Sequence, residues 1–152
     1  MGGHFQTLGK SGIEERLIPM FRTLIVEDNA TFRQMLKEIL ITRFPTMEII
    51  EEPDGNELFN KIDAFHPNII FMDIRLPGEN GLELTKKIKT TYPEIVVVIL
   101  TSYDLPEYRQ AARLSRADHF VTKDSATQDF LSLVESIILA KKPPSNQPKG
   151  QS

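Results

Sequence analysis

The sequence contains no cysteine, so the protein cannot form a disulfide or hold a metal ion through thiolates. Its longest uninterrupted apolar run extends only from Ile95 to Leu100, far less than the roughly 20 residues that cross a bilayer as a helix. Residues 1–20 also lack the continuous apolar segment of a secretory signal. These absences argue against a membrane-spanning or secreted chain, and we expect a cytoplasmic protein.

The sequence also has no excess of positively charged residues. The 152 residues include 18 lysines and arginines against 21 aspartates and glutamates, for a net charge of -3. This balance does not favour direct binding of nucleic acid by the chain. A composition of 40% hydrophobic and 26% charged residues is typical of one globular domain. We expect this domain over residues 21–141, with an N-terminal extension over 1–20 and a proline-rich linker or disordered tail over 142–152.

Five β-rich runs alternate with five helical patterns along the domain. The expected strands are 21–26, 47–50, 69–72, 95–100 and 119–122, and the expected helices are 27–43, 56–65, 80–92, 106–115 and 127–140. Such alternation predicts an α/β fold with right-handed crossovers and a mostly parallel, doubly wound sheet. Its weakest helix is 106–115, whose apolar face has only Ala111, Ala112 and Leu114. On helix 27–43 we expect Met35 to face inward, and on 80–92 we expect Lys86, Lys87 and Lys89 to face solvent.

Several chemically active side chains follow these strands where each strand ends. They are Glu27, Asp28, Asp73, Thr101 and Lys123. Function in such sheets gathers at the carboxyl ends of the strands. Three carboxylates in one crevice repel one another, and a bound cation relieves that repulsion. Hard oxygen ligands without histidine or cysteine suit Mg²⁺. Singly, Asp28 could also cap the first helix, and Glu27 could simply be solvated.

The other two side chains suit an anion beside that cation. Lys123 supplies a point charge and Thr101 a hydroxyl donor. An aspartate, a metal site, a lysine and a hydroxyl are the components needed for attack of the Asp73 carboxylate on a phosphoryl group. Ser102 is small enough to leave room for the incoming group.

The same residues carry a family resemblance. The matching positions are Glu27-Asp28, Asp73 with Leu76-Pro77-Gly78 and Asn80-Gly81, Thr101-Ser102, Phe120 and Lys123. With these motifs, residues 21–141 resemble the response-regulator receiver domain of two-component signalling. The resemblance implies a flavodoxin-like (βα)5 fold with strand order 2-1-3-4-5.

The resemblance also implies roles for particular residues. Asp73 would accept a phosphoryl group from a sensor histidine kinase or a histidine phosphotransfer protein, and the domain would catalyse only its own phosphorylation and dephosphorylation. Lys123 and Thr101 would contact the phosphoryl oxygens, and Thr101 would act with Phe120 as the switch. The implied ligands of Mg²⁺ are Glu27, Asp28, Asp73 and the backbone carbonyl of Arg75. The residues implied to tune dephosphorylation are Arg75, Ser102 and Tyr103.

Two departures from the family pattern stand out. Asp124-Ser125 follows Lys123 where the family usually has proline, which resembles the subfamily that carries a C-terminal helix-turn-helix output domain. Phe120 replaces the commoner tyrosine, so switching would depend on packing without a hydroxyl. The resemblance therefore implies an output in transcription through a DNA-binding domain absent from this chain, and it leaves open a homodimer formed on phosphorylation.

Three rival functions have weaker support. An aspartate-nucleophile phosphatase would resemble a pattern with a second acid at the position of Arg75. A flavin-binding domain would need a phosphate cradle after the first strand, where Glu27 and Asp28 would repel the phosphate. A stand-alone receiver, or a docking module that works without phosphorylation, remains the alternative.

Overall fold

The structure, a computed structural model, describes residues 21–141. The predicted extension at 1–20 and the predicted tail at 142–152 lie outside the described residues. No helix within 21–141 is both long enough and apolar enough to cross a membrane.

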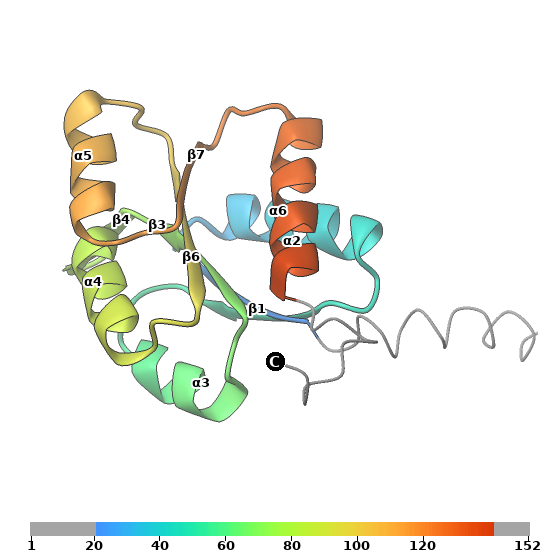
Figure 1. Ribbon diagram of the computed structural model, residues 1–152, viewed down its shortest axis with the longest axis horizontal. Helices are drawn as coiled ribbons and strands as arrows, with labels where there is room; N and C mark the ends of the chain where they lie inside the picture. The colour runs from blue at the N-terminus through green and yellow to red at the C-terminus, as the bar shows by residue number, and fades with distance from the viewer. Residues whose placement is uncertain (1–20, 142–152) are drawn as a thin grey trace, which may run out of the picture.

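A five-stranded parallel sheet forms the centre of the domain (Figure 1). Its strands are β1 (Arg22–Val26), β2 (Glu48–Glu52), β3 (Ile69–Asp73), β6 (Val96–Thr101) and β7 (His119–Thr122). They lie in the order β2-β1-β3-β6-β7, and every neighbouring pair is parallel. The doubly wound α/β fold and the strand order 2-1-3-4-5 are therefore confirmed. All five residues of β3 are buried, as expected for a central strand covered on both faces.

Helices cover the two faces of the sheet unequally (Figure 1). One face carries α2 (Ala30–Arg43) and α6 (Thr127–Lys141), and the other carries α3 (Leu58–Phe65), α4 (Gly81–Thr91) and α5 (Pro106–Leu114). Adjacent residues of β3 alternate between the two apolar layers, since Phe71 packs on the α2–α6 side and Met72 on the other. This alternation is the period-2 geometry of a strand.

Asparagine side chains start the two helices nearest the end of β3. The Asn29 Oδ1 accepts a hydrogen bond of 2.9 Å from the Phe32 backbone and begins α2. The Asn80 Oδ1 accepts one of 2.7 Å from the Leu82 backbone and begins α4. Both bonds satisfy amide groups that have no partner within the helix.

A short hairpin follows β3, where the sequence predicts only a turn. β4 (Arg75–Leu76) pairs antiparallel with β5 (Glu79–Asn80) across Pro77-Gly78. Gly78 has a φ of +71°, which suits the third position of a turn whose second residue is proline. The predicted turn is present, but its flanking residues form a second small sheet.

Three predicted side-chain orientations are wrong. Lys89 is buried, because its ammonium donates hydrogen bonds to the Ile95 carbonyl at 2.7 Å and to the Asp118 carboxylate at 2.8 Å. Met35 is 44% exposed and Leu114 is 70% exposed. Both side chains lie at the margin of the apolar stripe of their helix.

Candidate functional site

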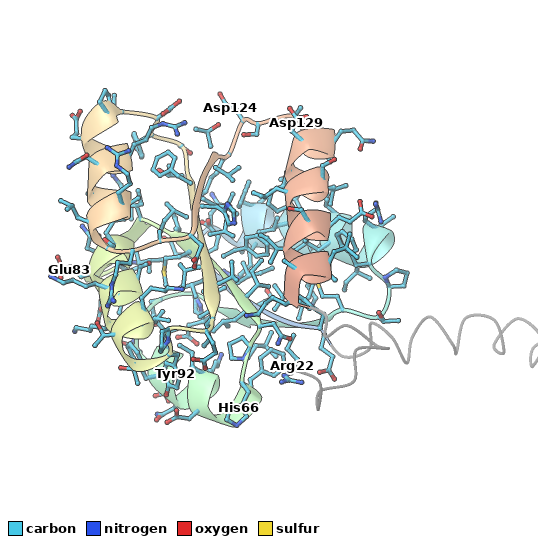
Figure 2. The ribbon with its side chains drawn as sticks, in the orientation of Figure 1. Arg22, His66, Glu83, Tyr92, Asp124 and Asp129 are labelled. Atoms are coloured by element: carbon cyan, nitrogen blue, oxygen red, sulfur yellow. The ribbon has the colours of Figure 1, made fainter. Side chains whose placement is uncertain are left out.

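The carboxyl ends of β1, β3, β6 and β7 meet at one edge of the sheet. Figure 2 shows Asp124 and Asp129 at this edge, and Arg22, His66 and Tyr92 at the opposite one. Asp73 and Thr101 are the last residues of β3 and β6, while Glu27 and Lys123 directly follow β1 and β7. The parallel register thus brings side chains from four separate segments together.

Three carboxylates lie close together at this edge. Glu27, Asp28 and Asp73 each offer an oxygen atom, and these atoms lie within 4.8 Å of one another. Glu27 and Asp73 are buried, with exposed fractions of 2% and 8%, whereas Asp28 is exposed. The cluster therefore opens to solvent on the side of Asp28.

The Asp73 carboxylate lies in an environment that disfavours its charged form. Burial raises its pKa from the ordinary value of 3.8 to about 6, and the charge of Glu27 adds to the rise. Lys123 and the Arg75 backbone oppose it. Such a carboxylate gains from any cation that approaches it.

Lys123 lies between two of the carboxylates. Its ammonium donates a hydrogen bond of 2.7 Å to Glu27 Oε1 and stands 3.5 Å from Asp73 Oδ2. It also lies 4.5 Å from the centre of the Phe32 ring, within the range of a cation–π contact. Lys123 is thus held near Asp73 from two sides.

Thr101 is fully buried beside the carboxylates. Its hydroxyl accepts a hydrogen bond of 3.0 Å from the Tyr103 backbone, and its carbonyl accepts one of 2.8 Å from the Lys123 backbone. The second bond extends the pairing of β6 with β7 by one residue. Ser102 is exposed next to it.

Aromatic rings and arginines cover the rim of the site. The Arg75 guanidinium lies 4.1 Å from the centre of the Tyr103 ring, whose centre is 6.0 Å from that of Tyr108. Hydrogen bonding with Tyr108 is the largest effect that raises the pKa of Arg75. The hairpin after β3 is therefore joined to the start of α5.

Phe120 is half-buried on β7 and packs against the layer that contains α4 and α5. The Arg109 guanidinium lies 4.6 Å from the centre of its ring, and the same guanidinium forms a 2.6 Å ion pair with Asp104. The loop after β6 is thus linked through Arg109 to the aromatic side chain on β7.

Gly81 lies directly behind Asp73. A Cβ atom at this position would stand 1.9 Å from the Asp73 carbonyl oxygen, a distance that no real contact allows. The Gly81 amide donates a hydrogen bond of 2.8 Å to the Ile74 carbonyl. Glycine here lets α4 begin against the end of β3, and the motif Asn80-Gly81 was its signal in the sequence.

Two neighbours of the site were missed from the sequence. Phe32 contacts Lys123, and Arg33 donates a 2.5 Å hydrogen bond to the Glu27 carbonyl. Both are on the first turns of α2. A helical pattern assigns Phe32 to the core and Arg33 to solvent, so only the knowledge that α2 starts at the acidic edge could have identified them.

The donor set fits a hard divalent cation. Carboxylate oxygens from three residues converge here, and within the described chain the cluster includes no histidine or cysteine. Mg²⁺ usually binds through one or two carboxylates and retains several waters, which the exposed side of the cluster would admit. The chemistry of the residues is therefore compatible with the predicted ion.

The fold and the site together define a class: a doubly wound α/β protein with an acidic pocket, a lysine and a hydroxyl at the carboxyl ends of its strands. The family model for the response regulator receiver domain matches residues 23–135. The chain belongs to this family, and the predicted resemblance is confirmed.

Relatives of the chain include longer regulatory proteins. The oxygen regulatory protein NreC of Staphylococcus haemolyticus is 29% identical over 117 residues, which are 76% of this chain and 54% of NreC. The chain thus spans about half the length of this curated relative. A crystal structure of a DNA-binding response regulator of the LuxR family from Staphylococcus aureus has a TM-score of 0.70 at 26% identity, covering 78% of this chain and 99% of that one.

A third comparison concerns a metal. The Mn²⁺-bound form of the response regulator Rcp1 has a TM-score of 0.63 at 26% identity, with 76% of this chain and 90% of that chain covered. A relative with the same fold therefore binds a divalent cation.

Proposed function

We propose that Asp73 accepts a phosphoryl group from a phosphohistidine on a sensor histidine kinase or a histidine phosphotransfer protein. The observation that carries this proposal is the placement of the Lys123 ammonium 3.5 Å from Asp73 Oδ2, within a cluster of three carboxylates. One cation is already in place there, and the excess of negative charge favours a second. Family membership supports the same role.

The reaction needs little acid–base chemistry from the protein. A carboxylate oxygen of Asp73 attacks the phosphorus atom while the bond from phosphorus to the histidine nitrogen breaks, and the imidazole leaves with a proton. Lys123 and the Thr101 hydroxyl bind oxygens of the transferred group, and the small Ser102 leaves space for it. Catalysis is then mainly positioning and charge neutralisation, so the domain acts as a signalling phosphoacceptor that catalyses only its own phosphorylation and dephosphorylation.

Mg²⁺ would be held by Glu27, Asp28, Asp73 and the backbone carbonyl of Arg75. When bound, it supplies positive charge to the phosphoryl oxygens. Lys123 exchanges its bond with Glu27 for contacts with the phosphoryl group, and Thr101 moves toward the same group. Phe120 then repacks, which alters the surface formed by α5, β7 and α6.

The output we propose is control of transcription through a DNA-binding domain. The support is the length of NreC, of which the chain covers 54%, and the LuxR-family regulator among the structural relatives. Phosphorylation would act on that domain directly or through a homodimer. Membership of the receiver-domain family supports a cytoplasmic location.

The experiment that tests the proposal is incubation with Mg²⁺ and a small acyl phosphate, followed by intact mass measurement of the wild type and of Asp73→Asn. We expect one phosphoryl adduct that requires Mg²⁺ and is absent from Asp73→Asn. The Asp124→Asn variant is a matched control, since this exposed carboxylate lies at the same edge, and it should label like the wild type.

Two negative results together would overturn the phosphoacceptor proposal: no phosphoryl adduct on the wild type, and no binding of Mg²⁺ in calorimetry. The alternative of a docking module on a receiver fold would then explain the chain better.

A further inference from the structure

Arg33 on the first turns of α2 connects the acidic pocket to the neighbouring strand. Its Nη1 donates a 2.5 Å hydrogen bond to the Glu27 carbonyl, and its Nε forms a 2.9 Å ion pair with Glu51 Oε1. The side chain is only 19% exposed. A single guanidinium thus holds together the segment after β1, the start of α2 and the end of β2.

The bond to Glu27 fixes the peptide from which Asp28 extends. Glu27 has other restraints, because its backbone amide donates to Glu52 at 3.0 Å and its carboxylate accepts from Asn29 and Lys123. Asp28 is exposed, so its carboxylate is placed mainly by the backbone on either side. Arg33 adds a bond to the carbonyl of the peptide that leads into Asp28.

Glu51 makes this restraint rigid. Its second oxygen accepts a hydrogen bond of 3.0 Å from Lys37, one turn further along α2. Burial opposes ionisation of Glu51, yet the bonds from Lys37 and Arg33 outweigh it and lower its pKa. Glu51 is therefore ionised at neutral pH. Its ion pair with Arg33 fixes the orientation in which the guanidinium donates to the Glu27 carbonyl.

We infer that Arg33 is a positioning residue for the divalent cation: it sets the Glu27-Asp28 segment in place before Mg²⁺ binds. This inference rests on the proposed function. Without Arg33, the segment would have to be ordered during binding, and that cost would reduce the affinity. Residues that orient metal ligands typically contribute 10- to 100-fold to metal affinity.

Lys37 provides a matched control. It lies on the same face of α2 as Arg33, and both side chains form ion pairs with Glu51. The difference between them is the hydrogen bond that Arg33 donates to the Glu27 carbonyl. Arg33→Met removes both contacts, and Lys37→Met removes only an ion pair to Glu51. A purely structural role for Arg33 would give two variants that differ in stability but not in their affinity for Mg²⁺.

The test is calorimetric titration of the purified protein with Mg²⁺, together with thermal unfolding without the ion. We expect Arg33→Met to raise the Kd by about 10-fold or more, and Lys37→Met to change it by less than about 2-fold. Arg33→Lys should restore part of the loss, since lysine keeps the charge but lacks the planar fork. Phosphorylation of Arg33→Met by an acyl phosphate should need more Mg²⁺ but reach the wild-type maximal rate at saturation.

Several results would overturn the inference. Equal Kd values for Arg33→Met and Lys37→Met would do so, as would a maximal rate of Arg33→Met that stays low at saturating Mg²⁺. If Arg33→Met does not fold, Arg33→Lys must weaken Mg²⁺ binding by more than Lys37→Met. Wild-type protein that binds no Mg²⁺ would overturn the proposed metal site as well, whereas normal wild-type binding with an unaffected Arg33→Met would overturn only this inference.

Discussion

The Asp73 side chain is held in the folded protein at an energetic cost. Its pKa of about 6 lies above the ordinary value of 3.8, mainly because the carboxylate is buried and Glu27 lies nearby. The folded protein therefore binds a proton more tightly at Asp73 than the unfolded chain does. Between these two pKa values, stability must fall as the pH rises.

This difference predicts that Asp73→Asn stabilises the protein at neutral pH. Without Mg²⁺ at pH 7.5, we expect its free energy of unfolding to exceed that of the wild type by about 1–3 kcal/mol, since one pKa unit corresponds to about 1.4 kcal/mol. Near pH 4 most of the advantage should disappear, because Asp73 is then protonated in the folded state. Urea unfolding followed by circular dichroism measures both values. An advantage of equal size at the two pH values would contradict the explanation.

Arg75 and Tyr103 give a second prediction at the scale of single residues. The stacked pair lies at the rim of the site, two positions beyond Asp73 and Thr101, where it would obstruct a water molecule that attacks the phosphoryl group. Arg75→Ala should therefore shorten the lifetime of phosphorylated protein by about 3- to 10-fold, which is roughly 1 kcal/mol in the barrier. Loss of the adduct over time, measured by intact mass, tests this. Lys86→Ala, on the exposed surface of α4, serves as control, and an unchanged lifetime in Arg75→Ala would contradict the prediction.

The contact between β3 and α4 leaves no room for a side chain at Gly81. Gly81→Ala should cost about 2–3 kcal/mol in the free energy of unfolding, because its Cβ would overlap the Asp73 carbonyl and the strand or helix must shift. The variant should also label poorly with acyl phosphate, since the shift displaces Asp73.

Gly78→Ala is the control for this prediction. Gly78 has a φ of +71° but nothing within 4 Å of an added Cβ, so only backbone strain of about 1 kcal/mol applies. It should label like the wild type. Equal losses of stability in the two glycine variants would show that the close approach to Asp73 is unimportant.

The main strands could be predicted because their signals are local. An apolar run such as Ile95–Leu100 has few alternatives to a buried strand. Strands β4 and β5 have two residues each, too few to form a pattern, and they were missed. The predicted strands also placed Asp73, Thr101 and Lys123 at one edge of the sheet. Each of these residues lies at the end of a strand, and parallel strands have their carboxyl ends at the same edge.

Contacts between distant segments could not be predicted in the same way. Lys89 was assigned to solvent because helical periodicity counts lysine as polar, but its long side chain reaches Asp118, 29 residues away along the sequence. Arg33 and Glu51 likewise meet across two elements. Such partners become visible only when the elements are packed.

Buried apolar side chains are distributed unevenly among the helices. α6 buries Phe130, Val134, Ile137 and Ile138, whereas α5 buries only Ala112. Local opening is easiest where few apolar side chains are buried. The sequence already predicted α5 as the least firmly packed helix.

Hydrogen exchange provides the test at this scale. The amides of α5 should exchange well before those of α6, in the native protein at neutral pH. The comparison is internal, so differences in global stability do not affect it. Equal protection of the two helices would mean that the rim contacts of Arg109 and Tyr108 secure α5 as firmly as core packing does.

The path of α6 has a consequence for signal transmission. The helix starts beside the acidic edge and ends at Lys141, whose ammonium bonds to the Glu94 carbonyl at the opposite edge (Figure 1). Its 15 residues span about 22 Å, and β1 begins at the same far edge as α6 ends. The acidic cluster and Lys141 therefore lie at opposite edges of the sheet. A change at Asp73 would therefore have to act across the length of α6 to reach Lys141.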